Sequence, residues 1–126
     1  MRATLKTLFT TLSALALSSN AIASTQTCRI KPTNILTDRG GGVYLSGNVI
    51  PSGSLSFELI CNVNATWHSI TPDACKNWVA SAVTAQATGA IIFIYFDDSE
   101  NGGITDCSLF PGWSQPYFQY LGTDTT

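Results

Sequence analysis

The chain has 126 residues, of which 44 % are hydrophobic and only 11 % are charged, and its formal net charge is −2. This length is enough for one domain and too short for two. With 6 basic and 8 acidic residues, the chain has no basic face for a nucleic-acid duplex, which excludes that class of partner.

Residues 1–23 have the three-part pattern of a cleavable signal peptide. Arg2 and Lys6 give a positive start, residues 8–17 are apolar or small, and residues 21–23 have the small-x-small pattern that signal peptidase needs. The apolar run is far shorter than the roughly 20 residues that span a bilayer. The alternative is an N-terminal anchor that stays attached. We expect cleavage, and therefore a secreted or periplasmic protein.

Cleavage after Ala23 leaves residues 24–126 as a single β-rich domain. Because Arg2 and Lys6 leave with the signal, four basic residues face the 8 acidic ones, and the net charge becomes −4. This charge disfavours binding to an anionic membrane by charge alone. No later stretch is apolar for long enough to cross a bilayer, so we expect no membrane insertion after cleavage.

The four cysteines, Cys28, Cys61, Cys75 and Cys107, all lie in this domain. An even number in a small exported chain indicates two disulfides. A zinc site is the alternative, but no two cysteines have the close spacing that it needs and the only histidine is His68. Three pairings exist, and the spacing alone does not choose among them. We favour Cys61–Cys75, which closes a short loop, and Cys28–Cys107, which ties the N-terminal segment to a late strand.

Along the chain, the first half of the domain predicts strands. Residues 28–30 predict a short strand or none, followed by a loop through residues 40–42, which are all glycine. Apolar and polar residues then alternate over 43–50 and over 55–63. The turn-forming residues 51–54 separate these two runs, so we expect a hairpin.

One helix follows. Thr71 is a hydroxyl N-cap, Pro72 occupies the first helical position, and Asp73 lies in the first turn, where the helix dipole favours an acid. Apolar residues continue at helical spacing and place Trp78 in the core. Gly89 is the expected C-cap.

The second half returns to strands. Residues 90–96 are almost wholly apolar and predict a strand buried on both faces. After an acidic loop at 97–103, residues 104–110 predict a strand, 111–116 a rigid turn, and 117–121 a last strand. Strands, one helix and then strands indicate a β-rich α+β fold. We expect a small antiparallel sheet or OB-like barrel with one packed helix.

The sequence offers little for catalysis or for a cofactor. The domain has one histidine, His68, and no frame such as G-x-S-x-G around a nucleophile. The segment Asp97–Ile104 matches the first half of a calcium loop, but its twelfth position is Ser108, which cannot supply the bidentate carboxylate. We therefore expect no enzyme, no cofactor and no metal, although ion binding at residues 97–103 stays open.

Aromatic residues in loop-like segments are the strongest functional signal. Exposed aromatic rings suggest a binding face, and sugar rings suit such faces. We expect Trp113, Tyr117 and Gln115 to bind ligand, with Trp67 as a second platform. Prolines on both sides of Trp113 stiffen that turn, so it loses little entropy when a ligand docks. The alternative is that Trp67 and Trp113 fold back as lids on a small core.

The segment 55–110 also resembles a known family. A strand hairpin with a cysteine precedes a helix containing Trp78, and Thr88-Gly89 leads into a strand of the type Ile-Ile-Phe-Ile-Tyr, followed by a late cysteine. This layout is similar to the B subunits of bacterial AB5 toxins, especially the subtilase-cytotoxin type. The resemblance implies an OB-fold, assembly into a pentamer, and glycan binding. The present chain is shorter, and the sugar-contacting residues of that family do not map onto it.

Two functions follow as hypotheses. The first is an exported, non-enzymatic glycan-binding protein, similar to a toxin B subunit and able to form a homo-oligomer. The second is a periplasmic inhibitor or immunity protein that blocks a hydrolase such as a lysozyme. The net charge of −4 and the acidic segment 97–100 favour the second through electrostatic steering, whereas the aromatic loops favour the first.

Overall fold

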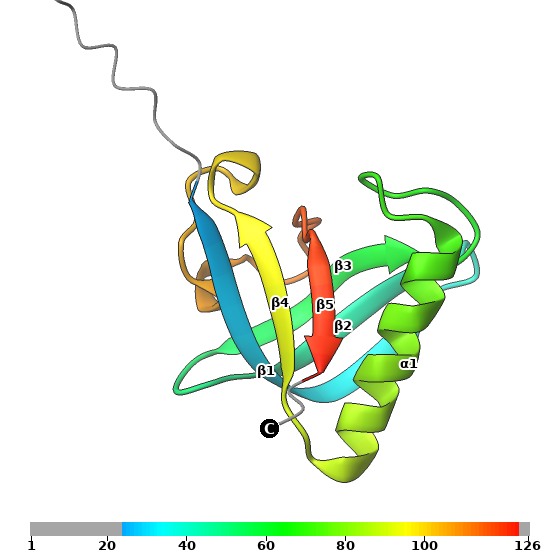
Figure 1. Ribbon diagram of the computed structural model, residues 1–126, viewed down its shortest axis with the longest axis horizontal. Helices are drawn as coiled ribbons and strands as arrows, with labels where there is room; N and C mark the ends of the chain where they lie inside the picture. Colours follow the sequence, from blue (N-terminus) through cyan, green and yellow to red (C-terminus); the bar gives the residue numbers. More distant parts are fainter. Residues whose placement is uncertain (1–23, 124–126) are drawn as a thin grey trace, which may run out of the picture.

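The computed structural model of the protein describes residues 24–123, so the predicted signal peptide lies outside the described residues. A five-stranded antiparallel sheet forms in the order β3-β2-β1-β4-β5, and it is not closed into a barrel (Figure 1). The elements are β1 (Thr25–Thr37), β2 (Gly42–Val49), β3 (Ser54–Asn62), helix α1 (Pro72–Thr88), β4 (Ile92–Asp97), the short 3-10 helices η1 (Ser99–Asn101) and η2 (Cys107–Leu109), and β5 (Tyr120–Thr123). The predicted α+β, β-rich class with one packed helix is confirmed.

The sequence predicts a short strand at residues 28–30, or none, and strand β1 shows that this prediction is wrong. It has 13 residues and pairs with β4 through its first half and with β2 through its second half. Its polar residues face outward, while Cys28 and Ile30 are buried. A β-bulge between Pro32 and Asn34 accommodates the proline, which cannot donate to the ladder. Pairing on two sides stabilises a strand whose local sequence is weakly apolar.

Helix α1 is confirmed at both ends. The Thr71 hydroxyl accepts from the Ala74 backbone N–H at 3.2 Å, and Gly89 ends the helix with a φ of 71°. Only glycine adopts that left-handed conformation without strain, which is why the helix ends there. The buried face of α1 consists of Cys75, Trp78, Ala82 and Ala85, so the prediction that Trp78 lies in the core is also confirmed.

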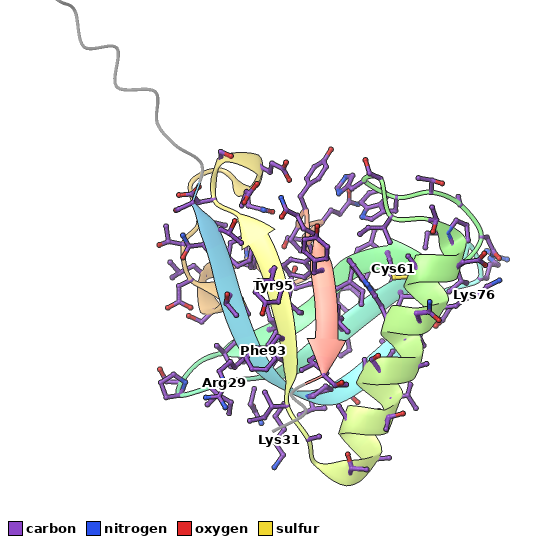
Figure 2. All side chains as sticks on the ribbon, viewed as in Figure 1. Arg29, Lys31, Cys61, Lys76, Phe93 and Tyr95 are labelled. Atoms are coloured by element: carbon purple, nitrogen blue, oxygen red, sulfur yellow. A yellow bond between two sulfur atoms is a disulfide. The ribbon has the colours of Figure 1, made fainter. Side chains whose placement is uncertain are left out.

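Strand β4 is buried on one face only, so the prediction of burial on both faces is wrong. Ile92, Ile94 and Phe96 point into the core, whereas Tyr95 is 37 % exposed. Among residues 24–123, no helix lies over the outer face of β4 (Figure 1). Arg29 from β1 partly covers Phe93 there, with its guanidinium carbon 5.8 Å from the ring centre (Figure 2).

The segment 104–110 forms no strand, which corrects another prediction. It contains the 3-10 helix η2, and the Asp106 carboxylate accepts from the Ser108 backbone N–H at 2.9 Å at its start. An aspartate that bonds the backbone two residues later favours a turn over a strand. The final strand is also shorter than expected and begins at Tyr120.

The disulfides pair Cys28 with Cys107 and Cys61 with Cys75, which is the pairing that we favour from the sequence. Their Cα–Cα distances are 5.9 Å and 5.5 Å. The first disulfide attaches η2 to β1. The second joins the end of β3 to the first turn of α1 and so closes the connecting segment 62–74. Over residues 24–123, no helix has the length and apolar character needed to cross a membrane.

Candidate functional site

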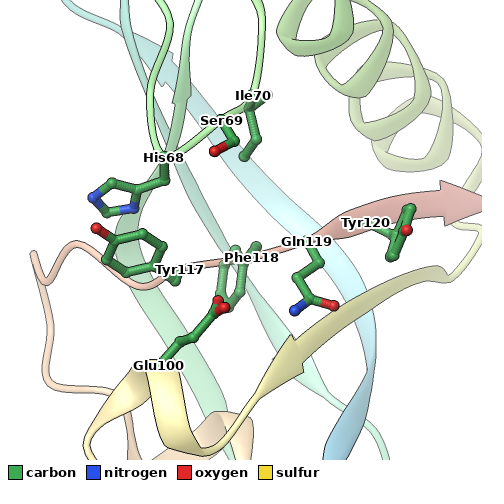
Figure 3. Close-up of a pocket in the computed structure, with 8 residues that line it drawn as sticks. All are labelled: His68, Ser69, Ile70, Glu100, Tyr117, Phe118, Gln119 and Tyr120. Atoms are coloured by element: carbon green, nitrogen blue, oxygen red, sulfur yellow. The ribbon is translucent and has the colours of Figure 1, made fainter.

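A cavity with a volume of about 420 Å³ lies where three segments meet (Figure 3). The turn before α1, helix η1 and the segment leading into β5 form its walls. Its lining residues are His68, Ser69, Ile70, Glu100, Tyr117, Phe118, Gln119 and Tyr120. We call it the Tyr117 cavity. It combines aromatic rings with an amide, a hydroxyl and a carboxylate, which is the mixed lining that small-molecule sites have.

A strained two-residue turn positions the first wall. Trp67 and Ile70 exchange two backbone hydrogen bonds of 2.9 Å and 2.8 Å. The residues between them, His68 and Ser69, have φ values of 45° and 67°. Hairpin turns of the type I′ class need positive φ at both central positions and usually contain asparagine or glycine there. A histidine and a serine in this conformation are unusual and favour a functional role for the turn.

Three rings stack behind this turn. The Trp67 ring lies 4.1 Å from His68, and His68 lies 3.3 Å from Tyr117 with only 3° between the planes. Figure 3 shows the imidazole against the tyrosine ring. Burial lowers the pKa of His68 below 6.5, while the Pro116 carbonyl and the Glu100 carboxylate oppose that shift weakly. The lowered pKa favours the neutral imidazole, and its ring is part of the aromatic stack.

Two ring nitrogens in this stack have no hydrogen-bond partner among residues 24–123. These are Nδ1 of His68 and Nε1 of Trp67, and both are buried. A buried polar atom without a partner costs folding free energy. Together with the positive φ values, these atoms show that the stack is held in place against local preference.

Asn101 fixes the position of Tyr117. The Asn101 amide nitrogen donates to the Asp97 carbonyl at 2.8 Å and to the Tyr117 carbonyl at 3.0 Å, and its amide oxygen accepts from the Tyr117 N–H at 2.7 Å. Asn101 is only 8 % exposed, whereas Tyr117 is 42 % exposed. The amide therefore holds the tyrosine backbone, and the ring is presented at the surface.

The far end of the cavity is formed by β5. Tyr120 is 65 % exposed and meets Tyr95, its neighbour on β4, edge to face at 6.3 Å. Gln119 donates to the Asp97 carboxylate at 2.7 Å, which fixes the orientation of its amide. Tyr120 lines the Tyr117 cavity and Tyr95 does not, although the two tyrosines are cross-strand partners.

Trp113 lies at a different place, which we call the Trp113 corner. Its ring stacks on Phe57 at 4.7 Å and tilts against Tyr44 at 5.6 Å, and the side chain is 61 % exposed. Its backbone N–H donates to the Ser56 carbonyl at 2.9 Å, and the Leu59 N–H donates to the Ser114 carbonyl at 3.0 Å. The turn is therefore paired with the outer edge of β3.

Glu58 anchors the Trp113 corner from below. Its side chain is fully buried, and its Oε2 accepts from both the backbone N–H of Ser114, at 3.0 Å, and the Ser114 hydroxyl. The other oxygen, Oε1, has no partner among the described residues. Burial raises the pKa of Glu58 above 4.5, although the bonds from Ser114 and Ser56 oppose this shift. A buried carboxyl of this kind favours its neutral form.

The structure brings together some of the sequence-predicted site residues and separates others. Trp67 and Tyr117 lie on either side of His68 in the ring stack, and Gln115 lines an adjoining cavity that also includes Tyr117. Trp113 lines neither of these two cavities. Its role as a binding platform stays a prediction.

Sequence reasoning missed three contributors. His68 gives no signal of its own, and only its place next to Trp67 hints at a stack. The alternation of β3 predicts Glu58 on the outer face of a regular strand, but a β-bulge near Phe57, which has a φ of 54°, turns Glu58 inward. The Phe57 N–H donates to the buried Ser46 hydroxyl at 2.8 Å and stabilises this bulge. Asn101 gives a signal only as an oxygen ligand of a calcium loop.

Two aspartates of that acidic loop bond to the protein itself. Asp97 accepts from Thr25 at 3.1 Å and from Gln119, and Asp98 accepts from the Ser24 hydroxyl at 3.0 Å. Within residues 24–123, no three histidine, cysteine, aspartate or glutamate side chains are grouped closely enough to hold a metal ion.

Comparisons of the chain with protein-family models, characterised proteins and solved structures found no match. The function is therefore argued from the site.

Proposed function

We propose that this is an exported, non-enzymatic glycan-binding protein and that the Tyr117 cavity is its binding site. The observation that supports this best is the composition of the cavity. Tyr117 and Tyr120 are partly exposed aromatic side chains in the lining, and Ser69, Glu100 and Gln119 add polar groups to it. A sugar ring has an apolar face of C–H groups and a polar edge of hydroxyls, so it matches both kinds of surface at once.

The rigidity of the site is a second argument. Asn101 holds the Tyr117 backbone at two points, and the Cys61–Cys75 disulfide closes the segment that contains Trp67 and His68. A shallow site gives little binding free energy, so it gains from walls that do not have to be ordered when the ligand arrives.

The five-stranded sheet with a helix between its third and fourth strands also has the element order of an OB-fold, although the sheet is open. This order is compatible with the resemblance to toxin B subunits.

The alternative function, inhibition of a basic hydrolase, has weaker support. It needs acidic side chains that are free to meet a basic cleft. Asp97, Asp98 and Asp106 instead accept hydrogen bonds from their own chain. Those bonds lower the pKa of Asp98 and of Asp106 and orient both carboxylates toward their own chain, which leaves Glu100 as the exposed acid of the segment 97–100.

Two neighbouring tyrosines provide the test. Tyr120→Ala removes an exposed ring that lines the cavity, whereas Tyr95→Ala removes its cross-strand partner, which does not line it. On a glycan array, Tyr120→Ala should weaken binding about tenfold, the equivalent of one lost stacking contact, and Tyr95→Ala should leave binding close to that of the unmodified protein.

Trp113→Ala is the third variant in this series. If this variant abolishes binding while Tyr120→Ala does not, the site is at the Trp113 corner and not in the Tyr117 cavity. If the protein binds no glycan on the array but co-purifies with and inhibits a basic lysozyme, the alternative function is correct.

A further inference from the structure

A second cavity adjoins the Tyr117 cavity. It has a volume of about 270 Å³, and its lining includes Gln115, Ser114, Pro111 and Pro116 from the turn before β5. Glu100 and Tyr117 line both cavities. Since two residues belong to both walls, the two spaces adjoin at Glu100 and Tyr117, and we call them together the groove, with each cavity as one compartment.

The second compartment is also lined by preformed structure. Asn101, which holds the Tyr117 backbone, is part of its wall, and Pro116 is buried. The Ser114 backbone is fixed by Glu58 and by Leu59. Gln115 is exposed, so its amide is available to bond a hydroxyl of a ligand in this compartment. The compartment is therefore lined by preformed structure and has two exposed polar side chains, Gln115 and Glu100.

The charges along the groove are of one sign. Glu100 lines both compartments, and among residues 24–123 no lysine or arginine lines either of them. Burial also lowers the pKa of His68, which disfavours a positive charge on that side chain. An anionic sugar would meet an acidic side chain with no cation in the lining to offset it, whereas the hydroxyls of a neutral sugar can donate to a carboxylate.

From this geometry we infer that the groove binds a neutral oligosaccharide of at least two sugar units, one in each compartment, with Tyr117 and Glu100 at the junction. This inference rests on the proposed glycan-binding function. It adds the length and the charge of the ligand, and it assigns Gln115 to the second subsite.

The test is a competition experiment with soluble sugars against the immobilised array. The probes are three series of increasing length, namely galactose and lactose, glucose and cellobiose, and N-acetylglucosamine and chitobiose, with sialyllactose as the anionic counterpart of lactose. In the series that the protein prefers, the disaccharide should compete at least about tenfold better than the monosaccharide, the gain expected from one added charge-assisted or well-placed hydrogen bond. Sialyllactose should compete less well than lactose.

Two variants in the groove and one control variant on α1 sharpen the result. Gln115→Ala should remove the advantage of the disaccharide and leave competition by the monosaccharide unchanged, while Gln86→Ala, which changes a glutamine on α1 away from the groove, should alter neither. Glu100→Gln should reduce the discrimination between lactose and sialyllactose.

The outcomes separate this inference from the proposed function. Equal competition by monosaccharide and disaccharide, or preference for sialyllactose over lactose, would overturn the inference while glycan binding stands. An unchanged disaccharide advantage in Gln115→Ala would overturn the assignment of the second subsite. Absence of any glycan binding would overturn the proposed function itself.

Discussion

Tyr117 and Trp113 belong to the same short segment, and both expose aromatic rings, yet they are held by different chemistry. An asparagine amide fixes Tyr117, with Asn101 bonding both the N–H and the carbonyl of the tyrosine backbone. A glutamate carboxyl fixes the turn of Trp113, with Glu58 accepting two bonds from Ser114. Both anchors are buried. Asn101 lies 16 residues before Tyr117, and Glu58 lies 56 residues before Ser114.

The difference lies in how well each anchor is satisfied. The Asn101 amide both donates and accepts, so each of its polar atoms has a backbone partner. An ionised carboxylate only accepts, and Oε1 of Glu58 has no partner among residues 24–123. The anchor of Tyr117 therefore does not titrate, whereas the anchor of Trp113 does. We expect the two regions to respond differently to mutation and to pH.

The largest effect should come from Asn101→Ala. This change removes three hydrogen bonds and leaves the backbone N–H and carbonyl of Tyr117 without their partner. We expect a loss of about 2 kcal/mol in the free energy of unfolding, because unsatisfied buried polar groups are costly. Glycan binding should fall with it, because Tyr117 loses its position. Urea unfolding and the glycan array measure the two effects.

Asn62→Ala is the matched control for this variant. Asn62 also bonds the backbone, at Gly40, Asn64 and Ala65, but it does not line the Tyr117 cavity and does not bond Tyr117. It should lose stability and keep its glycan binding. If Asn62→Ala loses binding to the same extent as Asn101→Ala, the loss reflects general destabilisation and not the position of Tyr117.

The second effect concerns pH and the Trp113 corner. Burial raises the pKa of Glu58 above 4.5, so the folded state favours the protonated acid. The corresponding stability is fully present below pH 4.5 and is lost as the pH rises through the folded-state pKa. The contribution of Glu58 to the unfolding free energy should therefore fall with increasing pH over this range.

Glu58→Gln isolates this contribution. Glutamine keeps the shape of the side chain and an oxygen acceptor for Ser114, and it does not ionise. Asp98, Asp106 and His68 have lowered pKa values and give the opposite pH dependence, but they are present in both proteins and cancel in the difference. The advantage of Glu58→Gln over the unmodified protein should grow as the pH rises. A difference that does not change with pH would show that Glu58 is not titrating in this range.

The sequence predicts those parts of the fold and of the site whose signals are local. The helix was predictable because its signals are local, with Thr71 as N-cap and Gly89 as C-cap. Tyr117 could be named as a candidate binding residue because an aromatic residue beside a proline-rich turn is also a local signal. Strand β1 was not predictable, because its stability comes from pairing with β2 and β4, which lie far away in sequence. Glu58 was missed because the bulge at Phe57 reverses the side of the strand on which it lies.

The smallest effect should come from the strained turn of the Tyr117 cavity. Ser69 has a φ of 67°, a conformation that costs a residue with a Cβ about 1–2 kcal/mol and costs glycine nothing. Glycine loses roughly 0.5–1 kcal/mol through its freer unfolded state, so Ser69→Gly should stabilise the protein by about 0.5–1 kcal/mol.

Ser52→Gly is the matched control, because Ser52 is an exposed turn serine without positive φ and should only lose stability. Thermal unfolding measures both. Because the Ser69 hydroxyl lines the cavity, glycan binding should weaken in Ser69→Gly even as its melting temperature rises. A variant that gained stability and kept full binding would show that the strain in this turn does not serve the site.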